Sequence, residues 1–195
     1  MKLKKLVALV SSAILAFSLV GCSIEGEESS AGSEGAVVGN GSIGFSVSTL
    51  NNPFFVTLSQ GAKDKAKEEG RDLIVVDAGD DAAKQTSDIE DLISKNISIL
   101  IVNPVDSDAV APAVKDAIAK GIKVISLDRA VNGVDVDCSI ASDNVEGAKM
   151  ATEYLVSLVG KDAKVVELEG TSGSSATIDR GTGFHKVADE QLNVV

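Results

Sequence analysis

The sequence has no tryptophan, a single histidine and two cysteines among its 195 residues. Two cysteines cannot build a disulfide framework of several bridges, and one histidine with two cysteines cannot supply the four ligands of a structural zinc site. Basic residues are also scarce, because 18 Lys and Arg stand against 29 Asp and Glu and leave a formal net charge of −11. A nucleic-acid-binding chain would be expected to be basic, so we expect no nucleic-acid partner.

What the chain does contain is typical of a globular protein. Hydrophobic residues make up 44 % of it and charged residues 24 %, which is the balance of a folded domain rather than of a disordered or collagen-like segment. At roughly 150 residues per domain, the length allows one domain and part of a second.

The longest apolar run lies near the N-terminus, from Leu6 to Val20, behind a cluster of lysines. It is too short and wrongly flanked for a bilayer-spanning anchor. The residues that end it, Leu19-Val20-Gly21-Cys22, resemble a bacterial lipobox. We therefore predict that residues 1–22 are a lipoprotein signal peptide and that Cys22 is lipidated; the alternative is an ordinary secretory peptide with a chance cysteine. The prediction places the protein outside the cytoplasm, held at the membrane through the lipid anchor only.

The next segment, residues 23–41, is rich in Ser, Gly and Glu and is predicted to form a flexible linker. Cys138 is then the one thiol left in the mature chain. A lone cysteine cannot form an intrachain disulfide, so we expect Cys138 to be a small buried apolar residue.

From Ser42 onward, short apolar runs alternate with segments whose apolar residues recur at helical spacing. Such alternation implies right-handed βαβ units and places the chain in the α/β class, with a doubly wound parallel sheet covered on both faces. The strands are expected at residues 43–47, 73–76, 97–102, 124–127, 138–141 and 165–168. The helices are expected between Asn52 and Gly70, at 82–95, from the N-cap Asp108 to Gly121, at 144–159, and from about Thr177 onward.

In a sheet of this kind, ligands bind beside the carboxyl ends of the strands. The loop after the first strand carries two adjacent phenylalanines, Phe54 and Phe55. Neighbouring residues on a helix point in different directions, so at most one of them can lie on the core stripe. Phe55 fits that stripe together with Leu58, which leaves Phe54 as either a flat wall for a ligand or a hydrophobic plug over the sheet edge.

The fourth strand is followed by the pair Asp128-Arg129. A carboxylate beside a guanidinium offers hydrogen-bond acceptors together with a fork of five donors, which suits a ligand with several hydroxyl groups. The alternative is a loop salt bridge of small energetic value.

The other loops carry weaker signals. The acidic loop 103–108 favours turn and cap chemistry over a cation site. The loop 170–175 lacks the sequence of a phosphate loop or of a nucleophile elbow, and His185 has no nucleophile partner in the pattern. We therefore expect that the protein is not an enzyme and that it uses no cofactor and no metal ion.

Several segments occur together in one order: 47–55, 103–110, 127–129, 140–144 and 180–184. With them the chain resembles the D-ribose-binding branch of the type I periplasmic binding proteins, the solute receptors of sugar ABC importers. The resemblance implies two doubly wound α/β lobes, joined by three crossing strands, with the sugar in the cleft between them.

The same resemblance implies the site residues. Asn52, Phe54 and Phe55 would line the cleft from the first lobe, Asp128 and Arg129 would hydrogen-bond the sugar hydroxyls, and Arg180 would reach in from the second lobe.

It also implies the domain boundaries, with an N-terminal sugar-binding lobe at 42–142 and the start of a C-terminal lobe at 143–195, so that the first lobe is nearly complete and the second only begun. The function so predicted is a monomeric, lipid-anchored receptor that captures ribose or a similar monosaccharide and delivers it to an ABC transporter permease, with chemotaxis as a further role. The alternatives are a receptor of the same fold for another pentose, a hexose or a furanosyl signal, and, with less support, an α/β enzyme.

Overall fold

The structure is a computed structural model and describes residues 41–195. The predicted signal peptide, Cys22 and all of the predicted linker except Gly41 lie outside these residues. Among residues 41–195, no helix has both the length and the apolar character needed to cross a bilayer.

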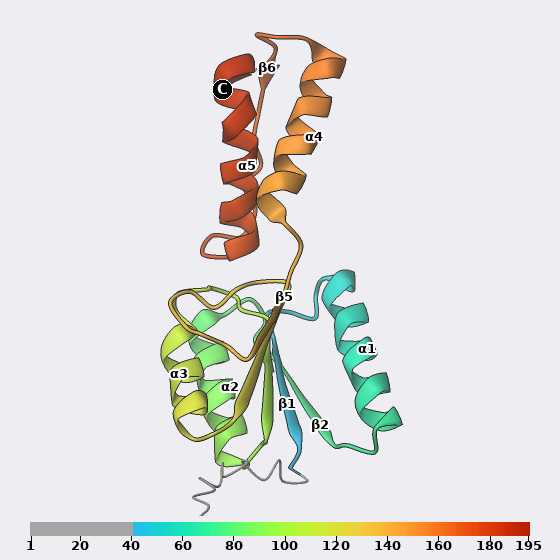
Figure 1. The fold of residues 1–195 in the computed structure, drawn as a ribbon, viewed down its shortest axis with the longest axis vertical. Coiled ribbons are helices and arrows are strands. Elements are labelled where there is room, and N and C mark those ends of the chain that lie inside the picture. Colours follow the sequence, from blue (N-terminus) through green and yellow to red (C-terminus); the bar gives the residue numbers. More distant parts are fainter. Residues whose placement is uncertain (1–40) are drawn as a thin grey trace, which may run out of the picture. The chain divides into compact units, whose positions relative to one another are not determined.

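A five-stranded parallel sheet forms the first part of the described chain (Figure 1). Its spatial order is β2-β1-β3-β4-β5, and the ladders keep the carboxyl ends of the strands at one edge. The strands are β1 (Ile43–Val47), β2 (Leu73–Asp77), β3 (Ile99–Val102), β4 (Lys123–Leu127) and β5 (Cys138–Ile140). The connecting helices are α1 (Pro53–Glu68), α2 (Ala82–Ser94) and α3 (Ala111–Ala119). The predicted α/β class with a parallel sheet is confirmed.

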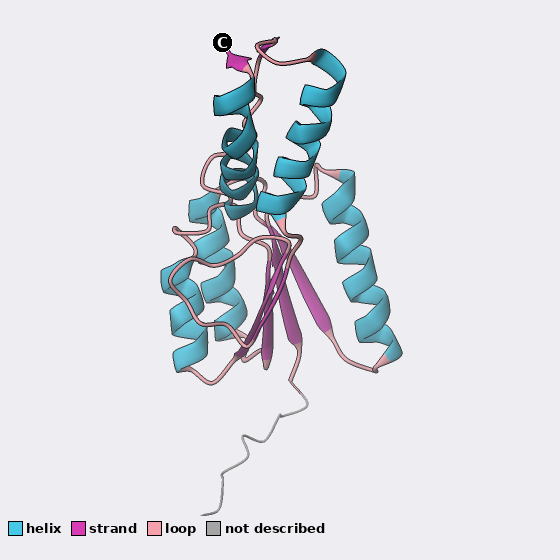
Figure 2. Cartoon of the chain, turned by 45° about the horizontal axis from the view of Figure 1, so that its top comes forward, coloured by secondary structure: helices cyan, strands magenta, loops and turns pink. Residues whose placement is uncertain are grey.

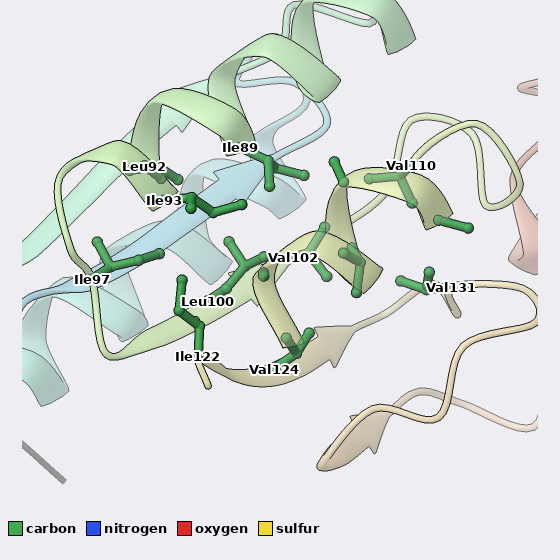
Figure 3. Packing of buried hydrophobic residues seen from close by; sticks show 14 residues of the cluster. Ile89, Leu92, Ile93, Ile97, Leu100, Val102, Val110, Ile122, Val124 and Val131 are labelled. Carbon is green, nitrogen blue, oxygen red and sulfur yellow. The ribbon is translucent and has the colours of Figure 1, made fainter. Parts of the chain in front are cut away.

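The two faces of the sheet carry separate hydrophobic clusters, because successive side chains of a strand point to opposite faces. Leu100 and Val102 of β3 pack with Ile89 and Leu92 of α2 in the larger cluster, on the face that α2 and α3 cover (Figures 1 and 3). Phe45 and Val47 of β1 belong to the smaller cluster, on the face of α1.

The face of α1 is only partly covered, which differs from the expected cover on both faces. One helix does not span five strands, and a groove of about 580 Å³ runs between α1 and the sheet. Ile101, Ile125 and Leu127 line it with side chains that are only partly buried, and Ile140 is 58 % exposed.

The remaining described chain pairs two long helices, α4 (Asn144–Val159) and α5 (Ser175–Gln191), with the short parallel strands β6 (Lys164–Val165) and β7 (Asn193–Val194) (Figure 2). The two helices approach closely at Gly183, where an added Cβ would lie 2.1 Å from the carbonyl oxygen of Val145. Only glycine leaves room for that approach.

Several sequence predictions need correction. β3 begins at Ile99 rather than at residue 97, the sixth strand covers two residues instead of four, and α5 starts at Ser175, before Thr177. Asp108 does not cap α3, because the Asp106 side chain accepts the backbone N–H groups of Asp108 and Ala109 at 2.9 and 2.8 Å and holds a turn ahead of the helix. The preference for turn chemistry in this loop is therefore confirmed, while the helix start was wrong.

Cys138 is the clearest error in predicted burial. It is exposed, not buried. The reason is its place on β5, the last strand of the sheet, where all three residues are exposed. A strand at the edge has a neighbour on one side only.

Candidate functional site

The carboxyl edge of the sheet brings together the loops that follow β1, β3 and β4. The strand order reverses direction between β1 and β3. The loops leaving these two strands therefore diverge to opposite faces and open a crevice, which is where ligands bind in open α/β sheets. The predicted residues of the first lobe all lie at this edge.

The first loop positions Asn52, Phe54 and Phe55. Asn52 is the N-cap of α1, and its Oδ1 accepts the backbone N–H of Phe54 at 2.9 Å. Phe55 is buried in the smaller cluster, whereas Phe54 is 54 % exposed and contacts the apolar groove. The two rings meet edge to face, with centroids 5.3 Å apart. The assignment of Phe55 to the core stripe is confirmed, and stacking of either ring on a sugar stays a prediction.

The second pair, Asp128 and Arg129, follows β4. The Arg129 side chain is only 11 % exposed and is held on three sides. Its Nη1 donates to the carbonyl of Pro104 at 2.7 Å, its Nε lies 3.8 Å from Oδ2 of Asp128, and its guanidinium carbon sits 5.1 Å from the centroid of the Phe55 ring. The Arg129 guanidinium is therefore largely buried and has three partners, while its contact with Asp128 is an ion pair. Whether the pair binds a ligand or is only a loop salt bridge stays a prediction.

The backbone at Asp128 is unusual, with a φ of +65°. Aspartate and asparagine tolerate this left-handed region better than most residues. The backbone N–H of Asp128 donates to the carbonyl of Ile140 at 2.7 Å, which ties the turn to β5. The Asp128 side chain is 30 % exposed and so can reach a ligand.

The electrostatics of the edge centre on Arg129. Burial lowers the pKa of this guanidinium from its ordinary value, while the negative charges of Asp128 and Asp80 raise it and the positive charge of Arg180 lowers it. The group stays charged, because an arginine pKa is far above neutrality. The charges of Asp128, Asp80 and Arg180 therefore all act on Arg129.

The last predicted residue, Arg180, lies on α5 and is exposed. The loop before α5 is hydrogen-bonded to the edge loops. The N–H of Ser107 donates to the carbonyl of Gly173 at 2.9 Å, and the N–H of Ala130 donates to Oγ of Ser175 at 2.8 Å. These bonds hold the N-terminal end of α5, the helix that carries Arg180, beside the loop of Arg129.

Sequence reasoning missed the polar residues that support these loops. Asp77, the last residue of β2, accepts the N–H of Leu50 at 3.1 Å, and the N–H of Asp80 donates to the carbonyl of Ser48 at 2.9 Å. Asn103 and Gln85 are fully buried beneath the edge. The signal that could have found Asp77 and Asn103 is a polar side chain at or just after the end of a buried strand.

The arrangement offers recognition groups without a reactive centre. Carboxylate acceptors, guanidinium donors and an exposed ring stand together at the edge, which is the set that binds hydroxyl groups and C–H faces of a small polar ligand. Among residues 41–195, no three His, Cys, Asp or Glu side chains gather as a metal site would require.

His185 lies on α5 between two carboxylates. Nδ1 is 2.7 Å from Oδ1 of Asp189 and Nε2 is 3.0 Å from Oε2 of Glu167. The hydrogen bond with Asp189 raises the pKa of His185 above its usual 6.5, the charge of Glu167 adds to this, and desolvation acts against it. The expected packing or surface role fits this geometry, since protonated His185 joins α5 to the segment after β6.

This pairing predicts a pH-dependent stability. Because the pKa of His185 is higher in the folded chain, the contribution is fully present below the unfolded-state pKa and is lost as the pH rises through the folded-state pKa. As the pH rises from about 6 through the raised pKa of His185, the melting temperature should fall more for the unsubstituted chain than for His185→Gln. Parallel melting curves for the two chains across that range would contradict the prediction.

The comparisons with known proteins decide the family. A periplasmic binding protein domain matches residues 43–195, which is most of the chain. The chain belongs to the periplasmic binding protein family. The ribose import binding protein of Bacillus subtilis is 46 % identical over 193 residues, which are 99 % of this chain and 63 % of that protein. Its counterpart in Escherichia coli K12 is 41 % identical over 196 aligned positions, which cover 100 % of this chain and 62 % of that protein.

Solved structures of periplasmic binding proteins show the same fold. An ABC transporter solute-binding protein from Mycobacterium smegmatis with bound glycerol gives a TM-score of 0.73 at 34 % identity, over 80 % of this chain and 55 % of that one. A galactofuranose-binding protein gives a TM-score of 0.74 at 26 % identity, over 79 % of this chain and 54 % of that one.

Two sequence expectations are thereby confirmed. The resemblance to ribose-binding members of the family holds, and the relatives are transport binding proteins rather than enzymes. The chain spans less than two thirds of the length of these two ribose import binding proteins. The roles of the individual site residues stay predictions.

Proposed function

We propose that this periplasmic binding protein captures ribose or a similar monosaccharide outside the cytoplasm and delivers it to an ABC importer. The observation that carries the proposal is the Asp128–Arg129 pair at the carboxyl edge of the sheet, in which the Arg129 guanidinium lies over the Phe55 ring. Identity of 46 % to a ribose import binding protein supports ribose as the first ligand to test.

In the proposed complex each group has a distinct task. Asp128 accepts hydrogen bonds from sugar hydroxyls, and Arg129 donates to sugar oxygens from a guanidinium that Pro104 and Phe55 already hold in place. Such pre-ordering lowers the entropy lost on binding. Phe54 offers an apolar face to the sugar C–H groups, while Asn52 holds the first turn of α1.

The proposal includes the parts of the protein that the structure does not describe. Residues 1–22 would be the signal peptide, Cys22 would carry the lipid, and residues 23–41 would link it to the lobe at 42–142. Residues 143–195 would begin the second lobe and bring Arg180 to the sugar. The protein would act as a monomer with a permease as its partner.

A ligand panel tests the proposal. Residues 42–195 would be compared with a chimera in which the C-terminal part of the Bacillus subtilis protein, beyond the matched region, follows Val195. Isothermal calorimetry with ribose, other pentoses, hexoses and polyols should give a micromolar or tighter dissociation constant for ribose with the chimera. Binding by the shorter chain should be at least about 100-fold weaker, because residues 42–195 span less than two thirds of the relatives' length and would leave the hydrogen bonds more exposed to water.

Each outcome of the panel is informative. Tighter binding of another pentose, a hexose or a furanose would replace ribose by that sugar and keep the receptor function. No binding of any sugar by a folded chimera would overturn the proposed function.

A further inference from the structure

The buried amide of Asn103 connects the loops that carry the proposed sugar-binding residues. Its Oδ1 accepts two hydrogen bonds from Ser48, from the backbone N–H at 3.2 Å and from Oγ at 2.7 Å. Its Nδ2 donates to the carbonyl of Leu127 at 3.1 Å. Asn103 thereby connects two loops. One begins at Ser48 and leads to Asn52 and Phe54, and the other begins at Leu127, directly before Asp128.

The position of Asn103 in the sheet makes this connection unusual. It follows β3, whose neighbours are β1 on one side and β4 on the other, and the strand order reverses between β1 and β3. The backbones at this edge diverge, so the ladder hydrogen bonds end there. The backbone N–H of Asn103 makes the last of these, to the carbonyl of Ser46 at 2.9 Å. Beyond that point, the Asn103 side chain provides the hydrogen bonds to both neighbouring chains, at Ser48 after β1 and at Leu127 of β4.

Gln85 of α2 supports Asn103 from below. Its Nε2 donates to the carbonyl of Asn103 at 3.0 Å and to Oγ of Ser46 at 3.2 Å, and its Oε1 accepts the N–H of Val105 at 2.7 Å. Gln85 and Asn103 are both 0 % exposed. Buried amides whose hydrogen bonds are satisfied hold their surroundings in one arrangement, since any other arrangement would leave buried polar groups without partners.

We propose that Asn103 is a positioning residue for ligand binding, which sets the distance between the Asn52–Phe55 segment and the Asp128–Arg129 pair without touching the ligand. The inference rests on the proposed sugar-binding function for the identity of the ligand. That Asn103 holds the two loops in place does not depend on any ligand. The turn at Asp128 has a φ of +65° and therefore needs outside support. The Asn103 bond to Leu127 is such a support, immediately before the turn.

The first test measures hydrogen exchange of Asn103→Ala in the ligand-free 195-residue chain. The N–H of Asp128 donates to Ile140 and has no bond to Asn103, so it reports whether loosening spreads through Leu127 to the turn. We expect exchange at Asp128 and at Phe54 to accelerate at least about 10-fold.

The matched control is Ser126→Ala. Ser126 is also buried, at 1 % exposure, and its Oγ bonds only the neighbouring strand, at Ser139. This control should lower the melting temperature as well but leave exchange at Asp128 and Phe54 within about 2-fold of the unsubstituted chain. Equal acceleration in both variants, or none in Asn103→Ala, would overturn the proposal.

The second test measures ribose binding by the chimera, at a temperature where circular dichroism shows all variants folded. Asn103→Ala should weaken binding at least about 10-fold and Ser126→Ala by less than about 2-fold. If the unsubstituted chimera binds no sugar, the proposed function fails, while the exchange experiment still decides the positioning role. If Asn103→Ala binds ribose with unchanged affinity, the positioning role is wrong although the receptor function stands.

Discussion

Replacing Asp128 by alanine in the completed chimera is expected to weaken ribose binding by at least ~1–3 kcal/mol, about 5- to 150-fold in the dissociation constant. The substitution removes the acceptor for sugar hydroxyls and leaves Arg129 without the carboxylate 3.8 Å from its Nε. A largely buried guanidinium that loses its carboxylate is left with an uncompensated charge, and its position at the site becomes less fixed. Isothermal calorimetry would measure the change.

Two further variants separate the carboxylate from the backbone. Alanine at a φ of +65° is strained, whereas asparagine and glycine both accept this region. Asp128→Asn should therefore lose affinity with little change in melting temperature, and Asp128→Gly should show the loss of the side chain without the strain. Full ribose affinity in Asp128→Asn would mean that the negative charge is not what holds the sugar.

Replacing Leu92 by alanine is expected to destabilise the described fold by ~2–5 kcal/mol. Leu92 is 0 % exposed in the larger cluster, between α2 and the sheet (Figure 3). It also packs over Gly44 of β1, where an added Cβ would lie 3.0 Å from one of its methyl groups. The glycine opposite has no side chain that could fill the space left by the smaller residue. Urea unfolding followed by circular dichroism would measure the loss.

The matched control is Leu158→Ala, which makes the same chemical change on α4 at a side chain that is 65 % exposed. Its effect on the free energy of unfolding should stay within about 0.5 kcal/mol. Similar losses in the two variants would show that Leu92 is not part of a close-packed core.

Where sequence prediction succeeded, the signal was local and periodic. The bounds of β1 and α4 were predicted correctly because apolar spacing and cap residues specify them within a few residues. Where it failed, the outcome depended on a distant partner. The segment 165–168 was predicted as a strand of four residues, yet only Lys164 and Val165 pair with β7, and Leu168 is 93 % exposed.

The candidate site divides in the same way. The expected ligand edge of the parallel sheet made Phe54, Asp128 and Arg129 candidates, but it left the alternatives open. The resemblance to ribose-binding proteins was needed to choose them as site residues. Asn103 lay in a predicted loop, but nothing local shows that its amide bonds Ser48, 55 positions away, and Leu127, 24 positions away. In the sequence, Gln85 has the pattern of an ordinary polar residue in an amphipathic helix, and nothing local indicates its buried hydrogen bonds.

The amino-acid sequence by itself determined the alternation of strands and helices and which loops lie at the carboxyl edge of the sheet, because both depend on spacing along the chain. The family followed from the resemblance of several segments in order. Only the tertiary structure decided that Arg129 lies over Phe55, that Asn103 joins the loops of β1 and β4, and that Cys138 is exposed. These depend on which strands become neighbours and which strand lies at the edge. The strand order is determined by contacts between residues that lie far apart in the chain, and it decides which side chains become buried.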